Sequence, residues 1–147
     1  MLQQIRPQLD DTAFYRVGGK QFYYGEFYHY GLAKLALSLA FLDPKKEGRA
    51  MSEIFGAYGW AEGLKMMTWL ANHMMVRGIN VFVPHAFSMK PCPDPDSPPH
   101  FSADGKNPQF PYFKNLMTYM NRVCHLIQNG RRNVSIGGLY TAEAEWM

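Results

Sequence analysis

The spacing of apolar residues along the chain predicts three helices. In the first, apolar residues recur at the three- and four-residue intervals of one helix face: Leu32, Leu35, Ala36, Leu39 and Ala40. We expect this helix to begin near Tyr28. We expect it to end at Asp43-Pro44, because a proline disfavours helical geometry in the residue before it and has no N–H to donate.

Two further helices follow the same rule. The second is indicated by Leu64, Met67, Leu70, Ala71, Met74 and Met75. Gly78 is expected in the left-handed conformation that commonly closes a helix. The third is indicated by Phe113, Leu116, Met117, Met120, Val123, Cys124 and Ile127, and it is expected to end at Asn129-Gly130.

Short apolar or mixed runs between and after these helices predict strands. The runs are 49–55, 79–83 (ended by Pro84) and 134–140. Strands that alternate with helices are typical of right-handed βαβ units and a parallel sheet. The predicted class is therefore α/β with about three strand–helix units, which fits either a doubly wound open sheet or part of a barrel. No G-x-G-x-x-G turn favours the dinucleotide-binding form of the open sheet.

The chain of 147 residues has the length of a single domain. We treat residues 1–26 as an N-terminal extension and the proline-rich residues 84–111 as a long functional loop. Aromatic residues make up 15% of the chain and there are ten methionines. This composition fits a generous core, a surface on which sugar rings stack, or both.

Charge, hydropathy and cysteine spacing argue against several classes of partner and site. The formal net charge of +3 is scattered, so no nucleic-acid partner is expected. No apolar run approaches the roughly 18 residues of a membrane span. The first residues also lack the pattern of a secretory leader, which leaves the localisation open. Cys92 and Cys124 are expected to be free thiols, since their spacing suits neither a disulfide scaffold nor a metal knuckle.

Glu53 is the first candidate for catalysis. In parallel α/β folds, functional groups gather at the carboxyl ends of the strands, and Glu53 comes near the end of the first predicted strand. Its apolar neighbours suit a carboxyl group that transfers a proton. The alternative is a structural ion pair with Arg49 or Arg77.

Other polar residues follow the same strand ends. Asn80 lies within the second predicted strand and His85 follows its end, although a lone histidine is more often a structural group. Glu62 is expected in the first turn of the second helix, where a carboxylate complements the helix dipole. Glu143 and Glu145 are paired carboxylates near the end of the chain, with solvent exposure as the simpler expectation. No metal site is predicted.

A series of motifs resembles large bacterial glycoside hydrolases of the α-L-rhamnosidase and family-2-like type. The motifs are S-E-I-F-G-A-Y-G-W at 52–60, V-R-G-I-N at 76–80, V-P-H-A-F-S at 83–88, P-P-H-F at 98–101 and N-P-Q at 107–109. The resemblance implies a catalytic (β/α)₈ barrel within a longer, multidomain chain, with relatives that are periplasmic or secreted. Glu53 then looks like an acid on the fourth barrel strand, and Asn80 and His85 look like residues of the fifth.

The expected activity is hydrolysis of O-glycosidic bonds in plant or host glycans, with α-L-rhamnosides among the candidate substrates. Glu53 would be the catalytic carboxyl group, and Glu143 or Glu145 the second one. The residues expected to bind the sugar are Tyr58, Trp60, Asn80, His85, Phe87 and His100. No cofactor is expected, and Asp94 and Asp96 are read as turn residues rather than as calcium ligands.

Two features depart from the resemblance. Ser52 stands where many barrel glycosidases carry an asparagine, so the hydrogen bond to a sugar 2-hydroxyl is in doubt. A closed barrel also needs eight strands and about 250 residues, so this chain cannot close one alone. The alternative function is therefore a non-catalytic half-barrel that binds carbohydrate or associates with itself through its exposed edges.

Overall fold

The fold is mixed α/β, with three α-helices and a parallel strand pair in the part of the chain that the computed structural model describes. That part comprises the main chain of residues 14–17 and 20–23, together with residues 31–56, 62–85, 107–130 and 133–139. The α-helices are α1 (Leu32–Leu42), α2 (Leu64–Met75) and α3 (Phe110–Gln128). A 3₁₀ helix, η2 (Pro44–Lys46), follows α1.

The central strands are parallel, as the alternation of strands and helices predicted. β3 (Met51–Ile54) pairs with β4 (Val81–Pro84), with Glu53 opposite Val83. The parallel pair and the intervening α2 form one βαβ unit, and α3 follows β4. Within the expected N-terminal extension, β1 (Phe14–Val17) and β2 (Lys20–Tyr23) form a separate antiparallel pair.

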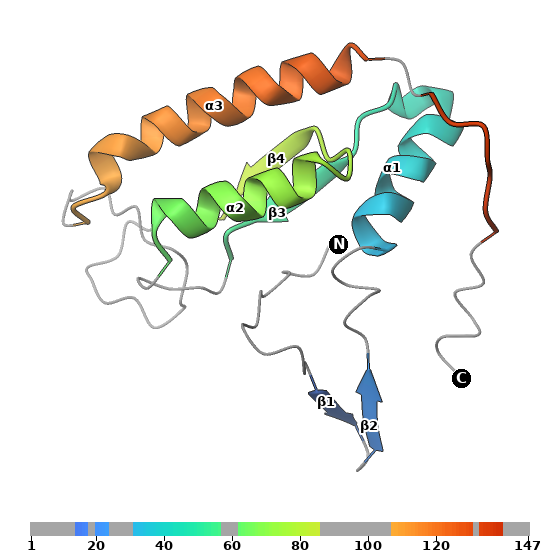
Figure 1. Ribbon diagram of the computed structural model, residues 1–147, viewed down its shortest axis with the longest axis horizontal. Helices are drawn as coiled ribbons and strands as arrows, with labels where there is room; N and C mark the ends of the chain where they lie inside the picture. Colours follow the sequence, from blue (N-terminus) through green and yellow to red (C-terminus); the bar gives the residue numbers. More distant parts are fainter. Residues whose placement is uncertain are drawn as a thin grey trace.

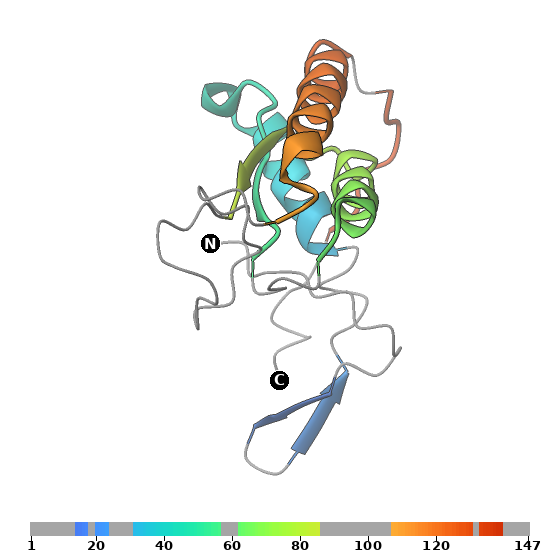
Figure 2. The ribbon, with the colours of Figure 1, turned by 90° about the vertical axis from the view of Figure 1, so that its left-hand side faces the viewer.

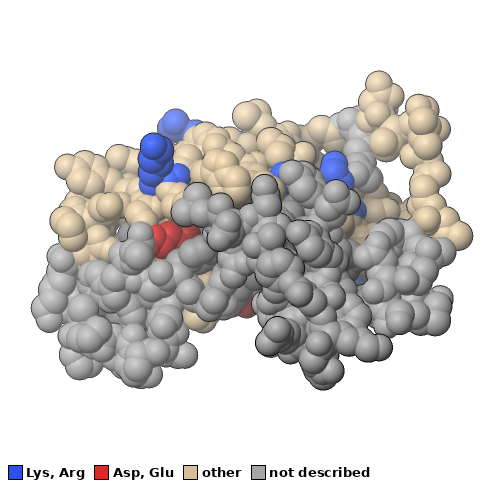
Figure 3. Space-filling model, turned by 60° about the horizontal axis from the view of Figure 1, so that its bottom comes forward, with Lys and Arg blue, Asp and Glu red and all other residues tan. Residues whose placement is uncertain are grey.

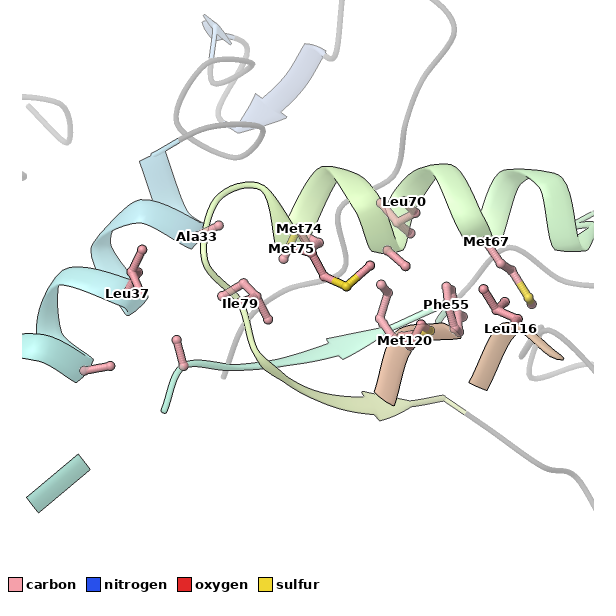
Figure 4. Close-up of a cluster of buried hydrophobic side chains, with 14 of the residues drawn as sticks. Ala33, Leu37, Phe55, Met67, Leu70, Met74, Met75, Ile79, Leu116 and Met120 are labelled. Carbon is pink, nitrogen blue, oxygen red and sulfur yellow. The ribbon is translucent and has the colours of Figure 1, made fainter. Parts of the chain in front are cut away.

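The helices α2 and α3 lie side by side along the strand pair, as Figures 1 and 2 show from two directions. The Tyr119 hydroxyl of α3 donates a 2.6 Å hydrogen bond to Asn72 Oδ1 of α2 and joins the two helices. Apolar residues of both helices meet Ile54 and Phe55 in the core, which Figure 4 shows with its methionine-rich lining. Six apolar residues predicted the second helix by their spacing, and five of these six are buried in the core cluster.

One face of the strand pair is covered and the other is open. Side chains of a strand alternate between its two faces. Ser52 and Ile54 are buried on the covered face, and Phe82 packs against the core. Met51 and Val83 on the opposite face keep 55% and 48% of their surface exposed. Among the described residues, the helices therefore cover one face of the strand pair, and the other face carries the exposed Met51 and Val83.

The predicted end of the first helix is confirmed and its predicted start is not described. Helix α1 ends at Leu42, and Asp43 Oδ1 accepts a 3.0 Å hydrogen bond from the Lys45 N–H, which caps η2. Residues 24–30 lie outside the described part of the chain. The third helix begins at Phe110, three residues before Phe113, because Pro111 suits the first turn of a helix.

The strand predicted at 134–140 is wrong for the residues that the structure describes. Residues 133–139 pair with no strand, and Val134, Ile136 and Leu139 are 66%, 86% and 93% exposed. A short run with apolar residues forms a strand only when a neighbouring strand supplies hydrogen bonds and an apolar face. Neither is present beside this segment among the described residues.

Gly78 has the left-handed conformation that the sequence predicted, with a φ of +94°. A Cβ atom at this position would also overlap with the side chain of Leu37 in α1. The turn between α2 and β4 therefore depends on glycine for both its backbone conformation and its close approach to α1.

We expect Gly78→Ala to lower the free energy of unfolding by about 2 kcal/mol, because alanine is strained in the left-handed region and its methyl group collides with Leu37. Urea unfolding followed by far-ultraviolet circular dichroism would measure the loss. Gly130→Ala is the matched control, since a Cβ atom there meets only the Ile127 carbonyl oxygen, at 3.7 Å. An unchanged midpoint for Gly78→Ala would contradict this account of the turn.

Among the described residues, no helix is both long enough and apolar enough to cross a membrane. On the face that Figure 3 shows, the Lys and Arg side chains lie in small separate groups among uncharged residues.

Candidate functional site

Glu53 lies near the carboxyl end of β3, on the open face of the strand pair. It is half-buried and stands directly opposite Val83 of β4. The ion pair proposed as its alternative role does not form: Arg49 instead pairs with Glu47, and the Arg77 guanidinium donates a 2.6 Å hydrogen bond to the His73 carbonyl oxygen. Within the described residues, no ion pair occupies the Glu53 carboxylate.

His85 extends the same edge by one residue beyond β4. Its N–H donates a 2.8 Å hydrogen bond to the Ile54 carbonyl oxygen, which holds the residue in line with the strands. Alternation along β4 places His85 on the same face as Val83, and therefore on the same face as Glu53. The structure thus brings two of the predicted site residues to one edge of the sheet. The Nδ1 atom of His85 is buried and has no hydrogen-bond partner in the described structure.

Ser52 does not take the place of the missing asparagine on the open face. Its side chain is buried on the covered face, and its hydroxyl donates a 2.9 Å hydrogen bond to the Glu53 carbonyl oxygen. Ser52 therefore supports the strand on which Glu53 is placed, and a ligand above the open face would not meet this hydroxyl.

Asn80 lies at the opposite end of the strands from His85. It is buried, and its side chain is occupied by the main chain: Oδ1 accepts from the Ala50 N–H and Nδ2 donates to the Gly48 carbonyl oxygen, both at 2.9 Å. The Gln128 side chain of α3 donates to the Asn80 carbonyl oxygen at 3.0 Å. Asn80 thus holds together the start of β3, the start of β4 and the end of α3. This role differs from the sugar-binding role expected from the sequence.

Glu62 does not lie in the first turn of α2, so the helix-dipole role expected for it is wrong. It precedes the N-cap residue Gly63, and it is 6% exposed. Both carboxyl oxygens are buried without a hydrogen-bond partner in the described structure. Burial raises the pKa of this carboxyl from 4.5 to about 8, because a charged carboxylate loses its hydration there.

Gln109 supplies the capping interaction that Glu62 does not. Its Oε1 accepts a 2.7 Å hydrogen bond from the Leu64 N–H in the first turn of α2. The residue preceding α3 therefore fixes the start of α2, and the amino ends of both helices lie at the same end of the molecule in Figure 1. Gln109 belongs to the N-P-Q motif, but no pattern in the sequence predicts this long-range contact.

A groove of about 350 Å³ separates β4 from α3. Its lining combines apolar groups of Phe82 and Met117 with polar groups of Asn121 and Gln128. Cys124 also lines it, as a free thiol whose pKa is raised by burial. Glu53 and His85 are not among the residues that line this groove.

The remaining predicted site residues lie outside the described part of the chain. They are Tyr58, Trp60, Phe87, His100, Glu143 and Glu145, together with Asp94, Asp96 and Cys92. Among the described residues, no three His, Cys, Asp or Glu side chains gather in a way that could hold a metal ion.

The site therefore consists of one half-buried carboxylate and one histidine at a strand edge, with a buried carboxyl group at the start of the following helix. Such an arrangement could bind an uncharged polar ligand or transfer a proton. Comparisons of the chain with protein families, with curated proteins and with solved structures found no match.

Proposed function

We propose that the chain is part of the catalytic barrel of a glycoside hydrolase that cleaves O-glycosidic bonds, with Glu53 as a catalytic carboxyl group. The observation that carries the proposal is the position of Glu53: it lies at the carboxyl end of a parallel strand, on an open sheet face shared with His85. Enzymes built on parallel α/β barrels keep their catalytic groups at this end of the strands.

The two faces of the strand pair support the barrel. In a (β/α) barrel the helices cover the outer face of the strands, while the inner face meets the other strands. The covered face of β3 and β4 packs on the helices, and the exposed Met51 and Val83 lie on the opposite face. Additional strands, from elsewhere in a longer chain or from another molecule, would enclose that face.

The chemistry needs one group to protonate the departing oxygen and a second carboxylate to attack the sugar or activate water. Glu53 lies on a strand and forms no ion pair with another described residue, which leaves its carboxyl group available for either role. His85 would orient a sugar hydroxyl beside it. Glu143 and Glu145 remain the proposed sources of the second carboxyl group.

The test is hydrolysis of aryl glycosides by the purified chain, beginning with p-nitrophenyl α-L-rhamnoside. We expect Glu53→Gln to lower kcat/KM by about 100-fold or more, because a carboxamide can neither donate nor accept the transferred proton. Glu47→Gln is the matched control, since Glu47 is exposed and pairs only with Arg49 among the described residues. Equal activity of wild type and Glu53→Gln would refute the catalytic role.

A second proposal is a non-catalytic half-barrel that associates with itself. The exposed apolar groups of Met51 and Val83 on an open sheet face favour it, because such a face is stabilised when another surface covers it. Light scattering tests the association: a concentration-dependent dimer supports the half-barrel, and a stable monomer argues against it. Binding of oligosaccharides without turnover would support the non-catalytic role.

A further inference from the structure

Three buried polar atoms lack partners in the described structure. They are both carboxyl oxygens of Glu62 and the Nδ1 atom of His85. Leaving a buried polar atom without a hydrogen bond costs about 1–3 kcal/mol, so folded proteins rarely keep such atoms unless they serve a purpose. These atoms are polar and are not stabilised by an apolar core. A ligand that forms hydrogen bonds with them would supply the missing partners.

The chain topology places both residues at the carboxyl end of the strand pair. Glu62 enters α2 after the connection from β3, and His85 follows β4, where its N–H binds the Ile54 carbonyl oxygen. The hydrogen bond from the Leu64 N–H to Gln109 fixes the start of α2 against the residue that precedes α3. Glu62 therefore precedes a helix start that is fixed at this end of the molecule.

Neither side chain caps a helix or forms a hydrogen bond with another described residue. The first turn of α2 is capped by Gln109, so the Glu62 carboxyl is not needed as a cap. The main chain of His85 continues the strand, which leaves its imidazole free of that duty. A ligand hydroxyl that reached these atoms would supply the hydrogen bonds that the described residues do not.

We propose that Glu62 and His85 are ligand groups that form hydrogen bonds with hydroxyl groups of an uncharged, polyhydroxylated ligand. The inference rests on the proposed glycoside hydrolase function and adds Glu62 to its substrate-binding groups. A protonated carboxyl group both donates and accepts, and so does the pair of ring nitrogens of a neutral imidazole. A sugar hydroxyl also does both, so it can satisfy either group.

The charge state of Glu62 favours an uncharged ligand over a cation. Burial raises its pKa to about 8, so the carboxyl group is mostly protonated at neutral pH. The other titratable side chains described at this end are Glu53, His85, Lys65, Tyr112 and Lys114, and the last three are exposed. A ligand with a cationic group would find no compensating negative charge on Glu62.

The test is isothermal titration calorimetry of the full chain with methyl α-L-rhamnoside, methyl β-D-glucoside and methyl β-D-galactoside. Glu62→Met removes both hydrogen-bonding functions at similar volume, and we expect it to weaken binding of the preferred glycoside by about tenfold. Glu62→Gln keeps a donor and an acceptor, so its affinity should stay within a fewfold of wild type. Glu47→Gln is the control for a change at an exposed carboxylate.

A pH series gives the second readout. Wild-type affinity should fall as the pH rises through about 8, where Glu62 loses its proton, whereas the affinity of Glu62→Gln should not show this step. Wild-type binding by Glu62→Met, or the same pH profile in Glu62→Gln, would overturn the role of Glu62 and leave the proposed function standing. Absence of binding and turnover for every glycoside would overturn both.

Discussion

Glu62→Gln is expected to remove most of the pH dependence of stability between about pH 5 and pH 8. The pKa of Glu62 is about 8 in the folded chain, against 4.5 for the free side chain. Because the folded value is the higher one, the unfolded state loses its proton first as the pH rises. The stability is therefore full below pH 4.5 and falls progressively until the folded carboxyl ionises.

The size of the effect follows from the shift. Each pKa unit corresponds to about 1.4 kcal/mol, so the full shift from 4.5 to about 8 implies a loss of about 5 kcal/mol over the whole transition. A glutamine has no such transition, because its carboxamide stays uncharged. We therefore expect the variant to match wild type at pH 4.5 and to be more stable than wild type at pH 8.

Urea unfolding at several pH values would measure this difference. Glu47→Gln should leave the pH dependence unchanged, since Glu47 is exposed and its Arg49 partner is exposed too. The ¹³C chemical shift of the Glu62 carboxyl gives an independent titration curve. A midpoint near 4.5 in that curve would show that the carboxyl is hydrated in solution, and the buried-acid account would then be wrong.

The helices and the parallel pair could be predicted from the sequence because each has a local signal. Met67, Leu70 and Met74 mark the buried face of α2 by their spacing, and Gly78 marks its end. The strand predicted at 134–140 was wrong, because an apolar run forms a strand only where a neighbouring strand is available to pair with it. Residues 133–139 have no such partner among the described residues.

The site was predictable in part for the same reason. Glu53 and His85 could be placed at one edge because the carboxyl ends of parallel strands coincide. The state of Glu62 could not be predicted, since its burial results from tertiary packing and its spacing suited an ordinary helix start. A signal was nevertheless present: Gly63 follows Glu62, and glycine is an accepted N-cap residue, which places Glu62 outside the helix.

Asn80→Ala is expected to lower the free energy of unfolding by about 3 kcal/mol. Its carboxamide joins two chain segments through the Ala50 N–H and the Gly48 carbonyl oxygen, each at 2.9 Å. Removing it leaves both main-chain groups without this partner in a buried place, and each orphaned group costs about 1–3 kcal/mol. An alanine also leaves a small cavity where the amide was packed.

Two further variants make the measurement specific. Asn80→Asp keeps an acceptor for the Ala50 N–H but faces the Gly48 carbonyl oxygen with an oxygen, so we expect a loss similar to that of alanine when the aspartate is charged. Asn115→Ala on α3 is the control, since Asn115 is exposed and the change should stay within about 0.5 kcal/mol. If glycoside binding fell in Asn80→Ala while the unfolding midpoint held, the residue would contact ligand as the sequence suggested. We expect instead that the unfolding midpoint falls. Asn80 lies at the amino end of the strands and fixes the pairing of β3 with β4, and this pairing sets the position of Glu53 at the carboxyl end.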